Sequence, residues 1–150
     1  MGITRQAFGL MLAILLSGAP AQAGGEEQSG RVLSHADAAV ILAKYSGYFD
    51  RYVDKEADLN ACVRFLNKTG IYFGLMEVVN GSEFTAEDCA RAMGQIDLVL
   101  SGEASYIHGK VKLPKGIETW SEFCTINDVK YRQGHKVMVE LLLVGSARMN

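Results

Sequence analysis

The feature that most constrains the fold is a recurrence of apolar residues at intervals of three and four in three separate stretches. Two of these stretches open on a residue that can cap a helix, Ser34 and Thr85, followed three positions later by Asp37 and Asp88. A hydroxyl and an acid at this spacing resemble a capping box. The sequence therefore predicts helices over residues 34–53, with a bend at Gly47, over 58–79, and over 85–100.

The segment between the third predicted helix and the C-terminus has a different character. Residues 101–123 contain three glycines and a proline, and the stretch "YIHGKVKL" suggests a short strand pair. A connection this long in a compact domain is usually functional or mobile. A last helix is expected from Asn127 or Asp128 to about Val144. The fold class is then all-α, a small domain of four main helices with a long loop or short hairpin between the third and the fourth.

The first 23 residues have the order of a secretory signal peptide. One basic residue, Arg5, precedes an apolar run, and small residues lead to Ala23. The apolar run is too short for a stable membrane span. The sequence predicts a signal peptide over 1–23, a flexible N-terminal segment over 24–33 and a single helical domain over 34–150. Such a chain would be exported to the periplasm.

The charge balance argues against nucleic acid as a partner. Without the predicted signal peptide, 14 basic residues face 17 acidic ones, and no cluster of Lys and Arg marks a basic face. No later stretch has 18 uninterrupted apolar residues, so no transmembrane segment is expected.

The three cysteines of an exported chain predict one disulfide and one leftover thiol. Three pairings are open. In a straight helix over 58–79, Cys62 lies roughly 25 Å from Val79, which is the end near which Cys89 would begin the next helix. A disulfide needs Cα atoms within about 7 Å. A bond between Cys62 and Cys89 is therefore disfavoured unless that helix breaks at Gly70. The expectation is a bond between Cys62 and Cys124, with Cys89 as a free buried thiol.

A catalytic role for Cys124 is the main alternative to the disulfide. A helix N-terminus lowers the pKa of a thiol, and the chain has His35, His108 and His135 as candidate bases. None of these histidines lies in a recognisable catalytic signature. There is also no CxxC, no HExxH and no acidic calcium loop. The sequence thus predicts a protein that is not an enzyme and holds neither metal nor cofactor.

Two segments carry a resemblance to a known family. Phe123-Cys124, then Val129, Gln133 and a Val-rich C-terminal helix, resemble the closing segment of the type VI secretion amidase immunity proteins, and "GIYFGLMEVVNG" is similar to that family's central helix. The family's cysteine ahead of the glycine motif is missing here, and "TINDV" replaces its Gly and Pro. The resemblance implies a periplasmic, disulfide-linked inhibitor of a peptidoglycan-cleaving amidase. Homodimers are common among such proteins, so a homodimer is one assembly that it implies.

The segment from Gly102 to Glu118 is the expected contact surface for a protein partner. It is rich in donors and acceptors, and its aromatic residues with polar tips suit an interface core. The candidate partner-binding residues are Glu103, Ser105, Tyr106, His108, Lys110 and Lys112. The next candidate surface is the first helix around Tyr45 and Tyr48. The alternative function is a small periplasmic chaperone or assembly helper, which should expose a large apolar patch.

Overall fold

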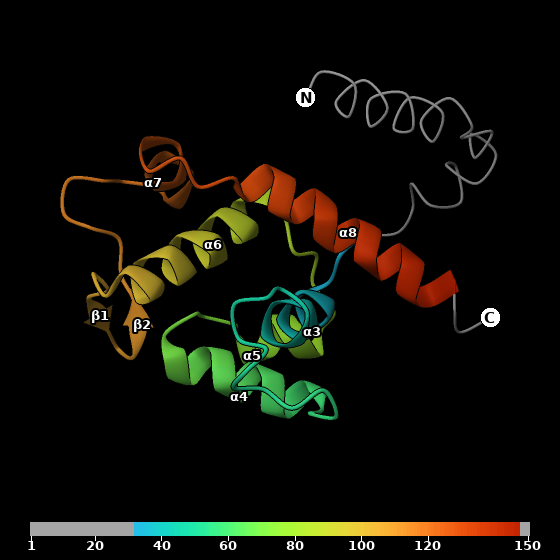
Figure 1. Ribbon diagram of the computed structural model, residues 1–150. Coiled ribbons are helices and arrows are strands. Elements are labelled where there is room, and N and C mark those ends of the chain that lie inside the picture. Colours follow the sequence, from blue (N-terminus) through green and yellow to red (C-terminus); the bar gives the residue numbers. More distant parts are fainter. Residues whose placement is uncertain (1–31, 148–150) are drawn as a thin grey trace, which may run out of the picture. The chain divides into compact units, whose positions relative to one another are not determined.

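The computed structural model of this chain describes residues 32–147 (Figure 1). This part is mostly helical, as the sequence predicts, with six helices and one antiparallel pair of short strands. The elements are α3 (His35–Lys44), α4 (Leu59–Thr69), α5 (Leu75–Val79), α6 (Ala86–Ser101), β1 (Tyr106–Ile107), β2 (Lys110–Val111), α7 (Trp120–Ile126) and α8 (Tyr131–Ala147). The predicted signal peptide and most of the predicted flexible segment, residues 24–31, lie outside the described residues.

Side-chain caps fix where the first helices begin. The hydroxyl of Ser34 accepts a hydrogen bond from the backbone N–H of Asp37 at 3.1 Å. Thr85 and Asp88 form the full capping box at the start of α6, since each side chain accepts from the other residue's N–H, at 3.2 and 2.9 Å. These bonds satisfy N–H groups that have no partner inside the helix. The predicted starts of both helices are confirmed.

Two helices end earlier than the apolar periodicity predicts. α3 stops at Lys44, and Gly47 has a φ of +84°. α4 stops at Thr69, where Gly70 adopts the left-handed conformation with φ +95°. Because that conformation closes a helix, the chain then runs without helix until α5 begins. The continuous helices predicted over 34–53 and 58–79 were therefore wrong.

The helix α7 was not predicted, because its seven residues are too few to show a period. Thr119 caps it by accepting from the N–H of Glu122 at 3.1 Å, and Phe123 and Cys124 are its buried residues. A left-handed Asp128, with φ +55°, separates it from α8. The last helix consequently begins at Tyr131, a few residues later than expected.

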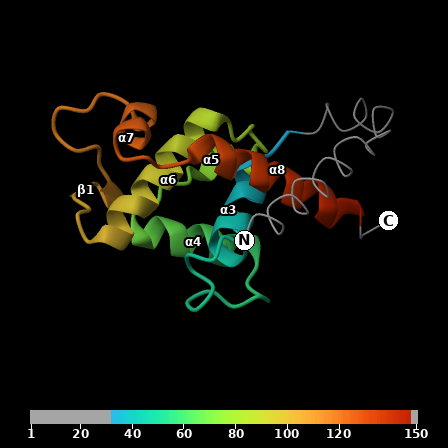
Figure 2. The same ribbon diagram turned by 45° about the horizontal axis from the view of Figure 1, so that its top comes forward.

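The core lies where α3 packs on α4 and where α6 packs on α7 and α8, as Figure 2 shows from a second side. At its centre the rings of Phe73 and Phe84 stack with centroids 5.6 Å apart, and the buried ring of His35 meets Phe84 edge-on at 5.2 Å. Leu33 is also buried, and its carbonyl accepts from the N–H of Phe84. The ordered domain thus includes Leu33, which the sequence assigned to the flexible segment. No helix between residues 32 and 147 is long and apolar enough to cross a membrane.

All three cysteines are free and buried, so the predicted disulfide between Cys62 and Cys124 is absent. Cys62 sits in α4 with its sulfur 4.0 Å from the carbonyl oxygen of Ala57, whereas the sulfur of Cys124 lies 3.3 Å from that of Ala90 in α6. The expectation rested on a straight second helix and on no helix around Cys124. Because α4 ends at Gly70 and α7 packs on α6, neither premise holds.

Candidate functional site

The predicted strand pair in the long connection exists as a tight hairpin. Tyr106 pairs with Val111 and Ile107 with Lys110. The two residues of the turn, His108 and Gly109, have φ of +50° and +76°. Positive φ at both positions is the mark of a type I′ turn, whose twist matches that of the strands. Glycine adopts this backbone freely, and histidine is among the residues that tolerate it best.

A single buried side chain ties this hairpin to the rest of the domain. Gln95, in α6, is 2% exposed. Its amide nitrogen donates to the carbonyl oxygen of Val111 at 3.0 Å, and its amide oxygen accepts from the N–H of Tyr72, also at 3.0 Å. The N–H of Val111 donates to the carbonyl oxygen of Gly70 at 2.9 Å. The hairpin is therefore fixed to α6 and to the segment after α4.

The ring of Tyr106 rests on the bare backbone of Gly70. A Cβ at Gly70 would lie 2.6 Å from Cε1 of that ring and 2.9 Å from a methyl group of Val111, both too close for any side chain. The other part of the ring faces solvent, since Tyr106 is 55% exposed. Gly70 thus has two roles: it ends α4, and it leaves room for the ring of Tyr106 to pack on its backbone.

Two cations gather around Tyr72 beside the hairpin. The ammonium of Lys110 lies 3.6 Å from the centroid of its ring, and the guanidinium carbon of Arg91 lies 5.5 Å from it. Burial lowers the pKa of Arg91, although Asp88 nearby acts in the opposite direction. Among the described residues, Nε and one terminal nitrogen of Arg91 have no hydrogen-bond partner. Exposed Lys110 and half-buried Arg91 therefore flank the ring of Tyr72 beside the hairpin.

The structure exposes all of the residues that the sequence proposed for partner binding and places most of them together. Five lie on or next to the hairpin, and the carbonyl oxygen of Ser105 accepts from the N–H of Lys112 at 2.9 Å. Glu103 stands apart, immediately after the end of α6. The exposed candidates are Glu103, Ser105, Tyr106, His108, Lys110 and Lys112.

The sequence analysis missed the residues that hold the hairpin in place. Gln95 carried a usable signal, because it is an amide on the apolar face of its helix, next to Ile96. A buried amide in such a stripe needs hydrogen-bond partners, and here it finds them in two separate segments. Tyr72 and Arg91 carried no comparable signal, since only the fold brings them to Lys110.

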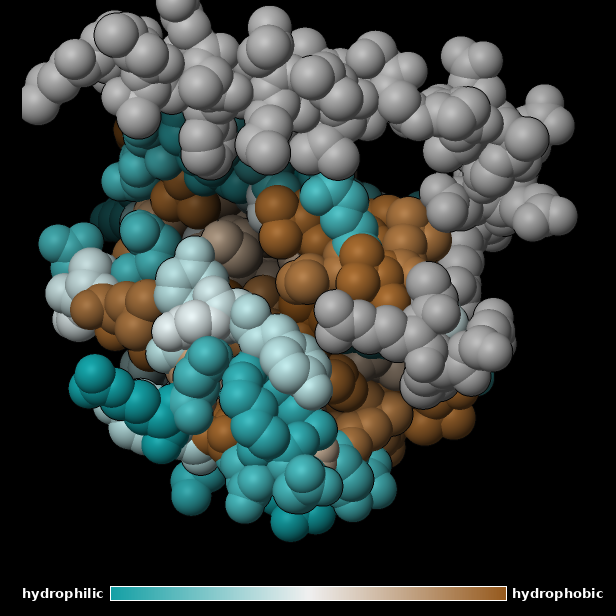
Figure 3. Space-filling model, turned by 45° about the vertical axis from the view of Figure 1, so that its right-hand side comes forward, coloured by the Kyte–Doolittle hydropathy of each residue, from teal (hydrophilic) through white to brown (hydrophobic). Residues whose placement is uncertain are grey.

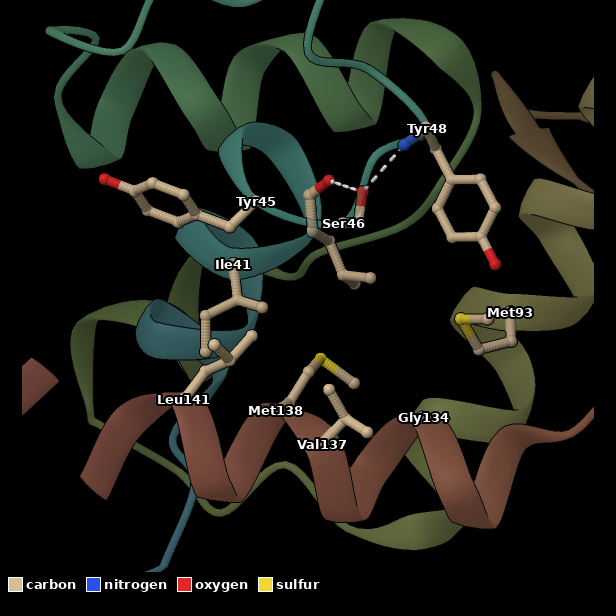
Figure 4. Close-up of a pocket in the computed structure, with 10 residues that line it drawn as sticks. Ile41, Tyr45, Ser46, Tyr48, Met93, Gly134, Val137, Met138 and Leu141 are labelled. Carbon is tan, nitrogen blue, oxygen red and sulfur yellow. Dashed lines mark hydrogen bonds between the residues drawn. The ribbon is translucent and has the colours of Figure 1, made fainter. Parts of the chain in front are cut away.

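A second surface lies between α3, α6 and α8. It is a mostly apolar pocket of about 190 Å³, into which Ile41, Met93 and Met138 point from three helices (Figure 4). Along α8, the exposed residues Val137, Leu141 and Val144 continue this apolar surface at helical spacing. Figure 3, which turns the C-terminal part of α8 toward the viewer, shows hydrophobic side chains gathered on this side. The pocket lining is Ile41, Leu42, Tyr45, Ser46, Tyr48, Met93, Gly134, Val137, Met138 and Leu141.

The three cysteine thiols are buried in the core, and burial makes them poor nucleophiles. The sulfur of Cys89 lies 3.3 Å from the carbonyl oxygen of Tyr131. Burial raises the pKa of Cys89 to about 12 and that of Cys124 to about 11, and it also raises the pKa of Cys62. A raised pKa keeps a thiol protonated and poorly nucleophilic.

Two histidine rings, the buried one of His35 and the half-buried one of His135, form hydrogen bonds with backbone carbonyl groups. His35 and His135 bond with their ring nitrogens to the carbonyl oxygens of Ser82 and Phe84, at 2.9 and 2.8 Å. In residues 32–147 no three His, Cys, Asp or Glu side chains come together as metal ligands. The absence of enzymatic activity stays a prediction.

Comparisons of this chain with protein-family models, with curated proteins and with solved structures give no match.

Proposed function

We propose that the protein is a periplasmic immunity protein that binds and blocks a peptidoglycan-cleaving amidase. The observation that supports this proposal is the hairpin, which is hydrogen-bonded to α6 and to the end of α4 and carries exposed side chains. Tyr106 and Ile107 are 55% and 54% exposed at its first strand. A structural element that is already ordered loses little conformational entropy when it binds, which favours tight inhibition.

The composition of this surface indicates the chemistry of the partner. Tyr106 and Ile107 are exposed on the first strand, and Lys110 and Lys112 are exposed on and after the second. Interfaces commonly combine an apolar centre with a charged rim, and complementary charge speeds association. We therefore expect the partner to carry acidic residues around an apolar cleft into which the hairpin fits.

The test is protection of a periplasm from a co-expressed amidase encoded beside this gene. The double variant Tyr106→Ala/His108→Ala should abolish binding in a pull-down and abolish survival. Because Tyr106 also seats the hairpin on Gly70, a cleaner variant is Ile107→Ser with Lys112→Glu. Loss of a hot spot should weaken binding by about thirtyfold or more.

The matched control is Tyr52→Ala, which removes a tyrosine that is 74% exposed between α3 and α4, away from the hairpin. This variant should bind and protect as the wild type does. Normal binding by Ile107→Ser/Lys112→Glu, with an unchanged thermal midpoint, would exclude the hairpin as the inhibitory surface.

The second candidate function is a periplasmic chaperone or assembly helper, and the apolar surface along α8 is the observation that favours it. An exposed apolar stripe beside a pocket is the kind of surface that holds unfolded segments. In this case the protein should suppress light scattering by an aggregating client, and Val137→Ser/Leu141→Ser should lose that effect. Ile107→Ser/Lys112→Glu should keep it, so the two functions are separable.

A further inference from the structure

Cys89 and Cys124 lie on two helices that pack against each other, α6 and α7. Cys89 lies in the second turn of α6, and Cys124 lies in α7. Neither residue has any exposed surface. The sulfur of Cys124 is 3.3 Å from the carbonyl oxygen of Ala90, the residue that follows Cys89. α7 therefore places its thiol on the part of α6 that carries the other one.

The chain after α7 connects Cys124 to Cys89 a second time, through a series of backbone hydrogen bonds. The carbonyl oxygen of Cys124 accepts from the N–H of Val129 at 2.8 Å, and the carbonyl oxygen of Val129 accepts from the N–H of Tyr131 at 3.0 Å. The carbonyl oxygen of Tyr131 then lies 3.3 Å from the sulfur of Cys89. A short hydrogen-bonded path thus returns from one cysteine to the other.

Packing farther along α6 keeps α7 in this position. A Cβ on Gly94 would lie 2.6 Å from the ring of Trp120 and 3.1 Å from that of Phe123. These two rings meet edge-on with centroids 5.7 Å apart. Because α7 lies so close to α6 at Gly94, the approach of Cys124 to the Cys89 turn is set by the packing of several side chains. Figures 1 and 2 both show α7 beside α6.

We propose that Cys89 and Cys124 form a disulfide when the chain folds in an oxidising compartment. The bond would join the two ends of the segment that carries the hairpin, because β1 and β2 lie between these residues in the sequence. Cys62 stays a free thiol. This inference does not depend on which partner the hairpin binds.

The oxidant for this step is an external disulfide, of a protein or of a small thiol. One cysteine thiolate attacks a sulfur of that disulfide, which forms a mixed disulfide and releases the first external thiolate. The thiolate of the other cysteine then attacks the sulfur of this chain in the mixed disulfide and releases the second external thiolate. The two cysteines lose two electrons and two protons, and the external disulfide gains both as two thiols.

The folded environment also indicates when the bond forms. Burial raises the pKa of both thiols, and among neighbouring ionisable groups Cys124 raises that of Cys89 most. A buried thiol with a raised pKa reacts slowly, so oxidation should occur before α7 has packed on α6. Once packed, the bond should resist reductants that cannot enter the core.

The test is to refold the full chain from denaturant with glutathione disulfide, and in parallel with dithiothreitol, and then to alkylate, digest and map the peptides. The expected result is one linked peptide pair that joins Cys89 to Cys124, with Cys62 alkylated after denaturation. The oxidised protein should melt roughly 10 °C above the reduced one. Cys62→Ser should keep both the bond and this difference, whereas Cys89→Ser and Cys124→Ser should lose both.

Recovery of Cys62 in the main linked peptide would overturn the proposal, and so would alkylation of all three cysteines after refolding with glutathione disulfide. The wild-type peptide map decides this alone, even where a serine variant fails to fold.

Discussion

The side-chain amide of Gln95 donates a hydrogen bond to the backbone carbonyl oxygen of Val111 at 3.0 Å, and this bond joins α6 to the hairpin. The same amide accepts from the N–H of Tyr72. One side chain therefore supplies hydrogen-bond partners to backbone groups in two separate segments of the chain. Since the proposed contact surface depends on the hairpin, its rigidity is a property that can be tested at Gln95.

Gln95→Leu should lower the free energy of unfolding by about 3 kcal/mol, because it leaves the N–H of Tyr72 and the carbonyl of Val111 without their partner in the interior. Amide exchange of residues 106–111 should accelerate more than that of α4. Asp97→Ala, at an exposed position of the same helix, is the control and should change stability by no more than about 0.5 kcal/mol.

Gln95→Glu refines this test. It keeps an acceptor for Tyr72 and regains a donor for Val111 only when it is protonated. Acidification should therefore restore part of its lost stability, as followed by urea unfolding at several pH values. An unchanged exchange rate of the hairpin amides in Gln95→Leu would show that Gln95 does not hold the hairpin.

Gly70→Ala should destabilise the protein more than Gly102→Ala, although both glycines end a helix with positive φ. The strain of a left-handed alanine is common to both, at about 1 kcal/mol. Only at Gly70 would the new Cβ also strike the ring of Tyr106, whereas nothing lies within 4 Å at Gly102. The difference between the two thermal midpoints therefore measures how much the packing of Tyr106 on Gly70 stabilises the protein. Equal midpoints would mean that this packing contributes nothing.

The sequence predicted those parts of the fold that depend on local chemistry. The capping box of Thr85 and Asp88 needs only two residues three positions apart, and the strand pair in "YIHGKVKL" needs only one short stretch of chain. The end of α4 at Gly70 was missed, because a glycine in an apolar helical stripe reads equally well as a site of close helix packing. The cysteine environment was missed for the same reason, since it depends on where α4 ends and α7 lies.

In the candidate site, too, only the features that depend on neighbouring residues in the sequence could be predicted. Its exposed residues could be chosen from the sequence, because they lie in one stretch of chain. The contacts of Lys110 and Arg91 with Tyr72 join three separate elements, so they follow only from the tertiary packing.

Gly94→Ala should lower the free energy of unfolding by roughly 1–3 kcal/mol, since the new methyl group would overlap the ring of Trp120 on α7. Gly145→Ala is the matched control in α8, where nothing lies within 4 Å. There alanine should raise stability by up to about 1 kcal/mol through its better helix propensity. Both values come from urea unfolding, and a neutral Gly94→Ala would mean that α7 does not pack tightly on α6.

The reduced protein should lose stability in alkaline solution. The folded-state pKa values of Cys89 and Cys124, about 12 and about 11, lie above the ordinary thiol value of 9.0 because both are buried. The stabilisation from keeping these thiols neutral is therefore complete below pH 9 and is lost as the pH rises through 11 and 12. Each thiol contributes a slope of at most about 1.4 kcal/mol per pH unit.

Urea unfolding of the reduced protein between pH 8.5 and 10.5 checks this dependence. The double variant Cys89→Ser/Cys124→Ser supplies the background from lysines and tyrosines, and it should show a shallower loss than the wild type. Oxidation of the wild type should flatten the dependence equally, because a disulfide has no proton to release. Equal slopes for reduced wild type and double variant would mean that these thiols are not the groups whose ionisation opposes folding.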